Sequence, residues 1–178
     1  MVNAEITKLL NNHDSEFSQS QQHDIAAVYQ HLKNIARSQR LKIRDSSLNT
    51  TALVNEAWIK SNKQSKSFTD RQHFFAYCAL AMRHILLNEA KRNQIITFVE
   101  YSDDTDQATF KESDYLIELD IQLKKLKSFN YRLEQVFTFK FFGDMEFDDI
   151  ATVLNVSERT VFRDWQKAKT MLAAAMQA

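Results

Sequence analysis

The sequence predicts an all-α protein, and three observations support this fold class. Proline is absent and glycine occurs once, at Gly143, so the tight turns and hairpins that depend on these residues are scarce. Apolar residues recur at spacings of three and four through most of the chain, which is the period of a helix with one buried face. At 178 residues the chain can form one large or two small helical domains.

The composition excludes several classes of protein. Lys+Arg and Asp+Glu number 23 each, so no global charge points to nucleic acid or to a membrane surface. The single Cys78 excludes an internal disulfide and fits a reducing compartment. No apolar run approaches the ~20 residues of a membrane span, and the N-terminus lacks the apolar core of a signal peptide. We therefore expect a soluble cytoplasmic protein without a membrane partner.

Residues 1–95 are expected to form the first helical domain. One helix covers residues 24–40 and a second covers residues 50–61. A polar, basic loop leads from there into a long helix over residues 72–94. Within the loop, Phe68 is interpreted either as a core anchor or as a platform for an unstacked base. The expected core positions of the three helices are Ile25, Val28, Leu32, Ile35, Ala36, Leu53, Val54, Ala57, Phe75, Cys78, Ala79, Met82, Ile85 and Leu86.

An acidic segment without a helical stripe, residues 96–112, is expected to link this domain to a second one over residues 113–178. Two helices rich in apolar residues, 114–129 and 131–142, open the second domain. Gly143 follows directly, at a position where a left-handed helix stop favours glycine.

The end of the chain has the spacing of a helix-turn-helix. A short helix with Ile150 and Ala151 facing inward is followed by a turn at Asn155 and Val156, and Ser157 can cap the next helix. The first half of that helix projects polar and basic residues, the pattern of a DNA recognition helix. The alternative is a helical hairpin with a solvated charged face, since Glu158 and Asp164 dilute the positive charge. The candidate DNA-binding residues are Arg159, Thr160, Arg163 and Lys167.

Two sequence blocks resemble extracytoplasmic-function (ECF) sigma factors of bacterial RNA polymerase. The C-terminal block is "MEFDDIATVLNVSERTVFRDWQKAK", which is similar to the helix-turn-helix of the family. The N-terminal block is "TALVNEAWIK" followed by "HFFAYCALAMRHILLNEAKRN", which is similar to the domain that binds polymerase and melts the promoter. The order and spacing agree from about Ile6 to Leu172.

The resemblance implies a division of labour among these segments. One segment would grip the clamp helices of the largest subunit of core RNA polymerase: Leu53, Val54, Asn55, Glu56 and Trp58. The loop and long helix would open the promoter and hold its minus-ten element through cationic and polar residues: Lys63, Lys66, Arg71, Arg83, Asn88, Lys91 and Arg92. The helix-turn-helix would read the minus-thirty-five element, and the linker would thread through the exit channel of the polymerase. The family has no catalytic activity of its own.

The helix that begins near residue 50 lacks a feature of the family. ECF sigma factors typically carry an acidic stretch there, whereas this chain has Asn49, Thr50, Thr51 and Ala52. Phosphorylation of Thr51, or of Thr50, would restore the negative charge, which a helix N-terminus also favours. The implied partner is a Ser/Thr protein kinase. The alternative is a constitutive factor in which one threonine merely caps the helix.

An enzyme and a stand-alone regulator are the alternatives to a sigma factor. No glycine-rich phosphate loop, metal-binding pair of histidines or isolated carboxylate pair supports an enzyme or a cofactor. A stand-alone helix-turn-helix regulator that binds DNA as a dimer is the serious alternative, since it would use the same C-terminal residues.

Overall fold

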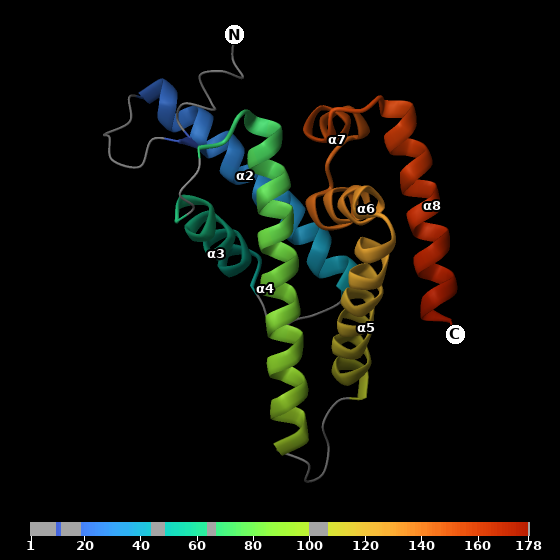
Figure 1. Ribbon diagram of the computed structural model, residues 1–178. Coiled ribbons are helices and arrows are strands. Elements are labelled where there is room, and N and C mark those ends of the chain that lie inside the picture. The colour runs from blue at the N-terminus through green and yellow to red at the C-terminus, as the bar shows by residue number, and fades with distance from the viewer. Residues whose placement is uncertain (1–9, 12–18, 44–48, 64–66, 100–106, 178) are drawn as a thin grey trace.

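The computed structural model describes residues 10–11, 19–43, 49–63, 67–99 and 107–177, and the chain is helical over most of these ranges. No strand occurs within them, so the all-α prediction is confirmed. The helices, shown in Figure 1, are α2 (Gln19–Ile43), α3 (Thr50–Asn62), α4 (Arg71–Val99), α5 (Gln107–Phe129), α6 (Tyr131–Gly143), α7 (Phe147–Leu154) and α8 (Glu158–Met176).

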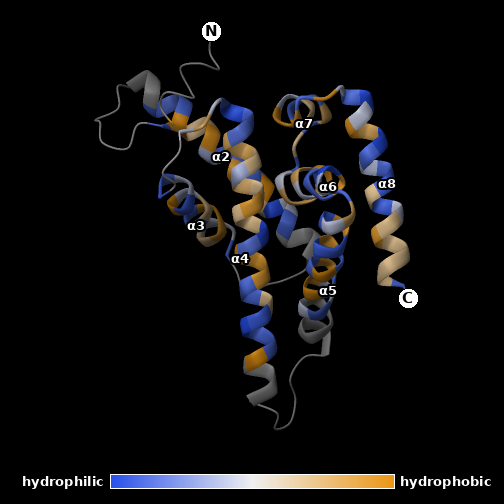
Figure 2. Cartoon of the chain, in the orientation of Figure 1, coloured by the Kyte–Doolittle hydropathy of each residue, from blue (hydrophilic) through white to orange (hydrophobic). Residues whose placement is uncertain are grey.

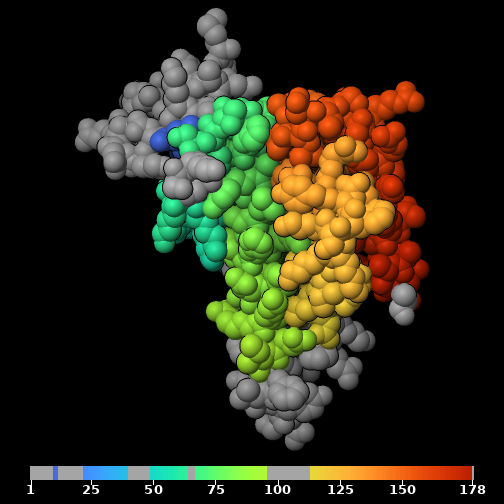
Figure 3. Space-filling view, in the orientation of Figure 1, coloured from blue at the N-terminus to red at the C-terminus, as the bar shows by residue number. Residues whose placement is uncertain are grey.

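The long helix α4 stands at the centre of the molecule. It packs against α3 on one side and against α5, α6 and α7 on the other (Figure 1). Helix α8 covers the outer side of α5 and α6. The N-terminal half of the chain, α2 to α4, therefore meets the C-terminal half, α5 to α8, along one face of α4. Figure 3 shows the surfaces of α4 and of the C-terminal half in direct contact along much of that helix.

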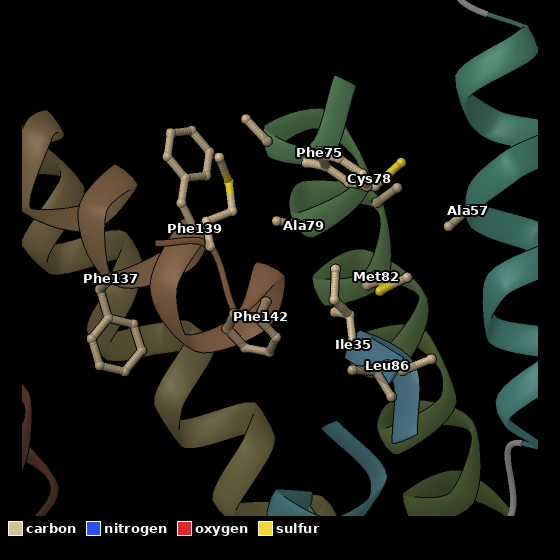
Figure 4. Packing of buried hydrophobic residues seen from close by; sticks show 14 of the residues in the cluster. Ile35, Ala57, Phe75, Cys78, Ala79, Met82, Leu86, Phe137, Phe139 and Phe142 are labelled. Carbon is tan, nitrogen blue, oxygen red and sulfur yellow. The ribbon is translucent and has the colours of Figure 1, made fainter. Parts of the chain in front are cut away.

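One hydrophobic core runs through both halves. Ala79 and Met82 of α4 are each at most 1% exposed, as is Phe142 of α6. Figure 4 shows these side chains facing one another, with Ile35 of α2 beside them. Burial of this apolar surface is the main favourable contribution to folding, at about 25 cal/mol per Å². The helical stripes expected from the sequence supply most of this core, although Ile25 is only half-buried.

The predicted linker is longer than the connection that the structure shows. Helix α4 continues to Val99 and α5 begins at Gln107, so helix occupies both ends of residues 96–112. Residues 100–106 lie outside the described part of the chain. The division into domains at these positions stays a prediction, and the two halves share a core in this structure.

Gly143 has a different role from the one predicted. It is the last residue of α6, and the left-handed residue is Asp144, with φ of 49°. A Cβ atom on Gly143 would lie 2.7 Å from Cβ of Ala79, which is too close for two carbon atoms. Glycine is therefore required by the close approach of α6 to α4, and the prediction of a left-handed glycine is wrong.

The turn between α7 and α8 lies at the expected residues. Asn155 has φ of 51° and ends α7, and its N–H and that of Val156 donate to carbonyl groups of the preceding turn. The Ser157 hydroxyl accepts the N–H of Thr160 at 3.2 Å and so caps α8. This compact turn fixes the direction in which α8 leaves α7.

Candidate nucleic-acid and protein interfaces

The first turn of α3 is neutral, and its cap is not a threonine. The side chain of Asn49 accepts the N–H of Thr51 at 2.7 Å, which makes Asn49 the N-cap. Thr51 and Ala52 are exposed, and no acidic residue lies in this turn. The alternative in which Thr50 or Thr51 caps the helix is therefore wrong, because the residue before them does so.

The segment predicted to grip polymerase divides into buried and exposed residues. Leu53 and Val54 are fully buried, so the prediction of direct contact by these two side chains is wrong: they anchor α3 to the core. Asn55 and Glu56 are exposed. Trp58 is half-buried, with its ring 5.8 Å from the ring of Phe74, and it keeps one side toward the surface.

Asn55 and Trp58 line an apolar groove between α2 and α3, of about 580 Å³. The Tyr29 hydroxyl of α2 donates to the Asn55 side chain at 2.6 Å, and the rings of Tyr29 and Trp58 meet edge to face at 6.5 Å. Ile59 on the rim is 50% exposed. The lining residues are Gln22, Ile25, Ala26, Tyr29, Asn55, Trp58 and Ile59. Sequence reasoning missed the part played by α2, because Ile25 fits a core stripe equally well.

Four of the residues predicted to hold the minus-ten element are exposed: Lys63, Asn88, Lys91 and Arg92. Arg92 is paired with Glu89 at 2.5 Å, and Lys66 lies outside the described residues. Arg71 is half-buried, with its guanidinium 5.1 Å from the centre of the Phe75 ring. It lines a small polar cavity together with acidic residues of the segment between α6 and α7, Asp144 and Glu146.

Arg83 is not on the surface, so the prediction that it binds DNA is wrong for this structure. Its side chain is 8% exposed and lies between α4 and the C-terminal half. It donates to Asp120 of α5 at 2.9 and 3.2 Å, to Glu134 of α6, and to the Thr138 hydroxyl at 3.1 Å. The carboxylates of Asp120 and Glu134 are as deeply buried as the guanidinium. Arg83, Asp120, Glu134 and Thr138 are called the Arg83 cluster below.

The Arg83 cluster satisfies its own charges. Thr138 donates its hydroxyl to Glu134 at 3.1 Å, and Lys124 reaches the second oxygen of Asp120 at 2.9 Å. Burial by itself raises the pKa of Asp120, but hydrogen bonds from Lys124 and Arg83 outweigh this effect and the pKa is lowered. Asp120 is therefore held in its charged form beside the buried guanidinium.

Phe68 is a core anchor rather than an exposed platform. It is 9% exposed, and its ring meets the rings of Phe74 and Tyr77 edge to face at 5.1 and 5.7 Å. The side chain of Asn11 accepts the N–H of Phe68 at 2.7 Å and donates to its carbonyl at 3.0 Å. The buried ring and this pair of hydrogen bonds fix the loop before α4.

A shallow basic and aromatic pocket of about 440 Å³ lies beside that loop, between α3 and α4. The Tyr77 hydroxyl donates to the carbonyl of Lys60 at 3.1 Å. Burial, together with the charge of Arg83, lowers the pKa of His84, which favours its neutral form. The lining residues are Lys60, Lys63, Tyr77, Leu80, Ala81 and His84. Of these residues, the sequence pattern predicts only Lys63 as a DNA contact. Tyr77 and His84 do not fit a basic pattern, and they are separated by more than one helical turn.

The exposed face of α8 carries three of its four predicted DNA-binding residues. Arg159, Arg163 and Lys167 follow one another at four-residue spacing and are all exposed. Thr160 is half-buried, and its hydroxyl lies 2.9 Å from the Ser157 hydroxyl. Figure 2 shows the hydrophilic residues of α8 concentrated toward its start.

Asp164 does not dilute this positive face. Its carboxylate is 6% exposed and accepts from Arg132 of α6 at 2.6 Å. Of the two acidic residues Glu158 and Asp164, Glu158 is exposed and Asp164 is buried. The hydrogen-bond partner lies 32 residues earlier in the chain, so sequence spacing alone could not have identified it.

The described part of the chain holds no group of three or more His, Cys, Asp or Glu side chains placed to bind a metal ion. Cys78 is buried, and burial raises the pKa of its thiol, which disfavours the reactive thiolate. None of the described helices is long and apolar enough to cross a bilayer.

The ECF sigma factor family model matches residues 3–178, and the chain belongs to that family. It is an alternative sigma factor that directs transcription initiation, and its partners are core RNA polymerase and promoter DNA. Comparisons with curated proteins and with solved structures gave no match.

Proposed function

We propose that this sigma factor binds core polymerase through the groove between α2 and α3, and reads the promoter with α4 and α8. The observation that carries the DNA part is the exposed row of Arg159, Arg163 and Lys167 on α8, which begins directly after a capped turn. The N-terminal half of such a helix enters the major groove in helix-turn-helix proteins.

Two features support binding of core polymerase at this site: the apolar groove between α2 and α3, and the polar residues on its edge. Trp58 is half-buried and lines the groove beside exposed Asn55 and Ile59, an arrangement typical of an aromatic anchor at a protein interface. Lys63, Asn88, Lys91 and Arg92 would contact the minus-ten element, and the pocket with Tyr77 and His84 would accommodate an unstacked base. The buried Arg83 is not part of this surface.

Arg163→Ala is expected to reduce promoter-specific transcription while leaving polymerase binding intact. Loss of one good contact to DNA weakens binding by about 1–3 kcal/mol. The measurement is run-off transcription by the reconstituted holoenzyme, alongside co-purification of core polymerase. Lys169→Ala is the matched control, because Lys169 is an exposed lysine of the same helix that lies over the Trp165 ring at 5.1 Å.

Normal transcription by alanine variants of Arg159, Arg163 and Lys167 alike would refute the recognition-helix assignment. Tight, sequence-specific DNA binding by the free protein at physiological salt, without initiation by polymerase, would instead favour a stand-alone regulator.

The neutral turn at the start of α3 supports a further part of the proposal, control by a Ser/Thr protein kinase. A phosphate on Thr51 would add about 1.5–2 negative charges at the helix N-terminus, beside Asn55 and Glu56. Thr51 is exposed, and its side chain is not the cap of the helix. Thr50 is half-buried, which makes Thr51 the preferred position.

Thr51→Ala is expected to abolish recovery of core polymerase from cells in which the kinase is active, with little effect on stability. Exposed positions that are not caps change the free energy of unfolding by no more than about 0.5 kcal/mol. The matched control is Thr51→Ser, which keeps a hydroxyl that a kinase can modify. The measurements are pull-down of polymerase and mass spectrometry of the recovered protein.

The acidic pair Thr51→Glu with Ala52→Asp should recover part of the binding without a kinase, since each carboxylate supplies about half the charge of a phosphate. Equal recovery by wild type, Thr51→Ala and the acidic pair would leave a constitutive sigma factor.

A further inference from the structure

An aromatic side chain stands within the basic face of α8 and is not needed by the core. Phe162 is 50% exposed, although it lies in a helix whose buried positions, Val161 and Ala168, are completely enclosed. It directly precedes the exposed Arg163 and lies one turn after the exposed Arg159. Single exposed apolar residues are common on protein surfaces, so what distinguishes Phe162 is its place among the charged residues of α8.

The Phe162 ring is held in place by its neighbours. It meets the Phe147 ring of α7 edge to face, with 5.7 Å between centroids. The Phe147 ring also contacts the Lys140 ammonium group, which lies 5.1 Å from its centre. Edge-to-face aromatic pairs contribute about 0.5–1.5 kcal/mol beyond the area they bury, so Phe147 restricts the orientation of Phe162.

The position of Phe162 on α8 matches the part of a recognition helix that faces base edges. It is the fifth residue after the Ser157 cap, and it shares a helix face with Arg159 and Gln166, which lie three residues before it and four after it. Both of these neighbours are exposed. Arginine and glutamine donate to purines in the major groove, whereas the apolar feature presented there is the 5-methyl group of thymine.

We propose that Phe162 is a specificity-determining residue that selects thymine in the upstream promoter element by contact with its 5-methyl group. This inference rests on the proposed role of α8 in reading duplex DNA. The charge around the ring favours DNA as its occupant, because Arg159, Arg163 and Lys167 would meet phosphates or guanines on either side. Contact with Phe147 already restricts the orientation of the Phe162 ring, so binding costs less side-chain entropy.

The first experiment uses holoenzyme reconstituted from core polymerase and the full chain. Templates randomised over the upstream element are transcribed with wild type, Phe162→Ala and Phe162→Leu, and the transcribed templates are sequenced. Wild type should enrich thymine at one or two adjacent positions. Phe162→Ala should lose that preference there and keep the preferences elsewhere, and Phe162→Leu should keep part of it.

The second experiment changes only the DNA, so it does not depend on the folding of a variant. Deoxyuridine replaces thymine at the selected position, which removes the methyl group and leaves base pairing unchanged. Wild type should lose about three- to tenfold in template binding, as expected for one buried methyl group and the contacts around it. Phe162→Ala should bind the two templates equally, whereas Arg163→Ala should bind both more weakly and retain the difference between them.

Three outcomes would overturn the inference. Wild type could be insensitive to deoxyuridine at every thymine, or Phe162→Ala could keep the full sensitivity. Alternatively, Phe162→Ala could lose polymerase in a pull-down while keeping the wild-type sequence preference, which would make Phe162 a protein contact. Failure of the proposed function is distinguishable, because Arg163→Ala would then transcribe as well as wild type.

Discussion

Arg83→Ala is expected to lower the free energy of unfolding by about 3–5 kcal/mol, the usual effect of removing one partner of a buried ion pair. The variant leaves the carboxylates of Asp120 and Glu134, each 7% exposed or less, without the guanidinium that pairs with both. Lys124 still reaches Asp120, and the Thr138 hydroxyl still donates to Glu134. The measurement is denaturant unfolding at neutral pH, followed by the helical signal.

The matched control for this experiment is Arg92→Ala. Arg92 lies on the same helix and is also paired with a glutamate, but its side chain is 67% exposed. Exposed pairs of this kind contribute about 0–1 kcal/mol, so the two variants should differ by several-fold in their effect on stability. Arg83→Lys should fall between wild type and alanine, since it keeps the charge but loses the planar fork of donors. Equal losses from Arg83→Ala and Arg92→Ala would contradict the buried cluster.

Gly143→Ala is expected to destabilise the protein by about 1–3 kcal/mol, the range for overpacking in a close-packed interior. The sign of this change in stability is what tests the contact between α6 and α4. Alanine in place of a helical glycine normally stabilises a helix by about 1 kcal/mol. Here the new Cβ would lie 2.7 Å from Cβ of Ala79 and 3.3 Å from Cγ of Met145, so α6 and α4 must move apart.

A double-mutant cycle isolates this contact from helix propensity. Ala79→Gly alone should cost about 1 kcal/mol, because it introduces a glycine into α4. In combination with Gly143→Ala it removes the clash, so the double variant should be more stable than the sum of the two single effects predicts. A more stable Gly143→Ala single variant, or strict additivity in the cycle, would show that the two helices do not meet at these residues.

The helices and most of the core could be predicted from the sequence because both follow from local periodicity. Residues of a stripe such as Val28, Leu32 and Ile35 lie on one helix face whatever else the chain does. The predicted end of α6, residue 142, lies one residue before the observed end at Gly143. The physical reason given for that glycine was nevertheless wrong, because it depends on a helix that lies 64 residues earlier, at Ala79.

The errors at the site come from contacts between residues far apart in the sequence. Arg83 belongs to a stretch of α4 with other polar and basic residues, and nothing local shows that Asp120 and Glu134 will enclose it. Asp164 was counted against DNA binding for the same reason, since its partner Arg132 lies on another helix. Phe162 lies outside the apolar stripe of its helix, and the residues expected to bind DNA there were polar or basic. In each case the exposure of the side chain, which only the tertiary structure defines, decides its role.

The shared core of the two halves limits how this protein can be re-engineered to use other promoters. A segment comprising α5 to α8 from a relative would have to fit against Ala79 and Met82 and supply two carboxylates for Arg83. Exchange of whole domains is thus constrained by packing far from DNA. The outward face of α8 carries no such requirement, since Arg159 and Arg163 are exposed and make no contribution to the core. On the proposed role of α8, a few surface substitutions on that face would change promoter choice without altering the packing of the interior.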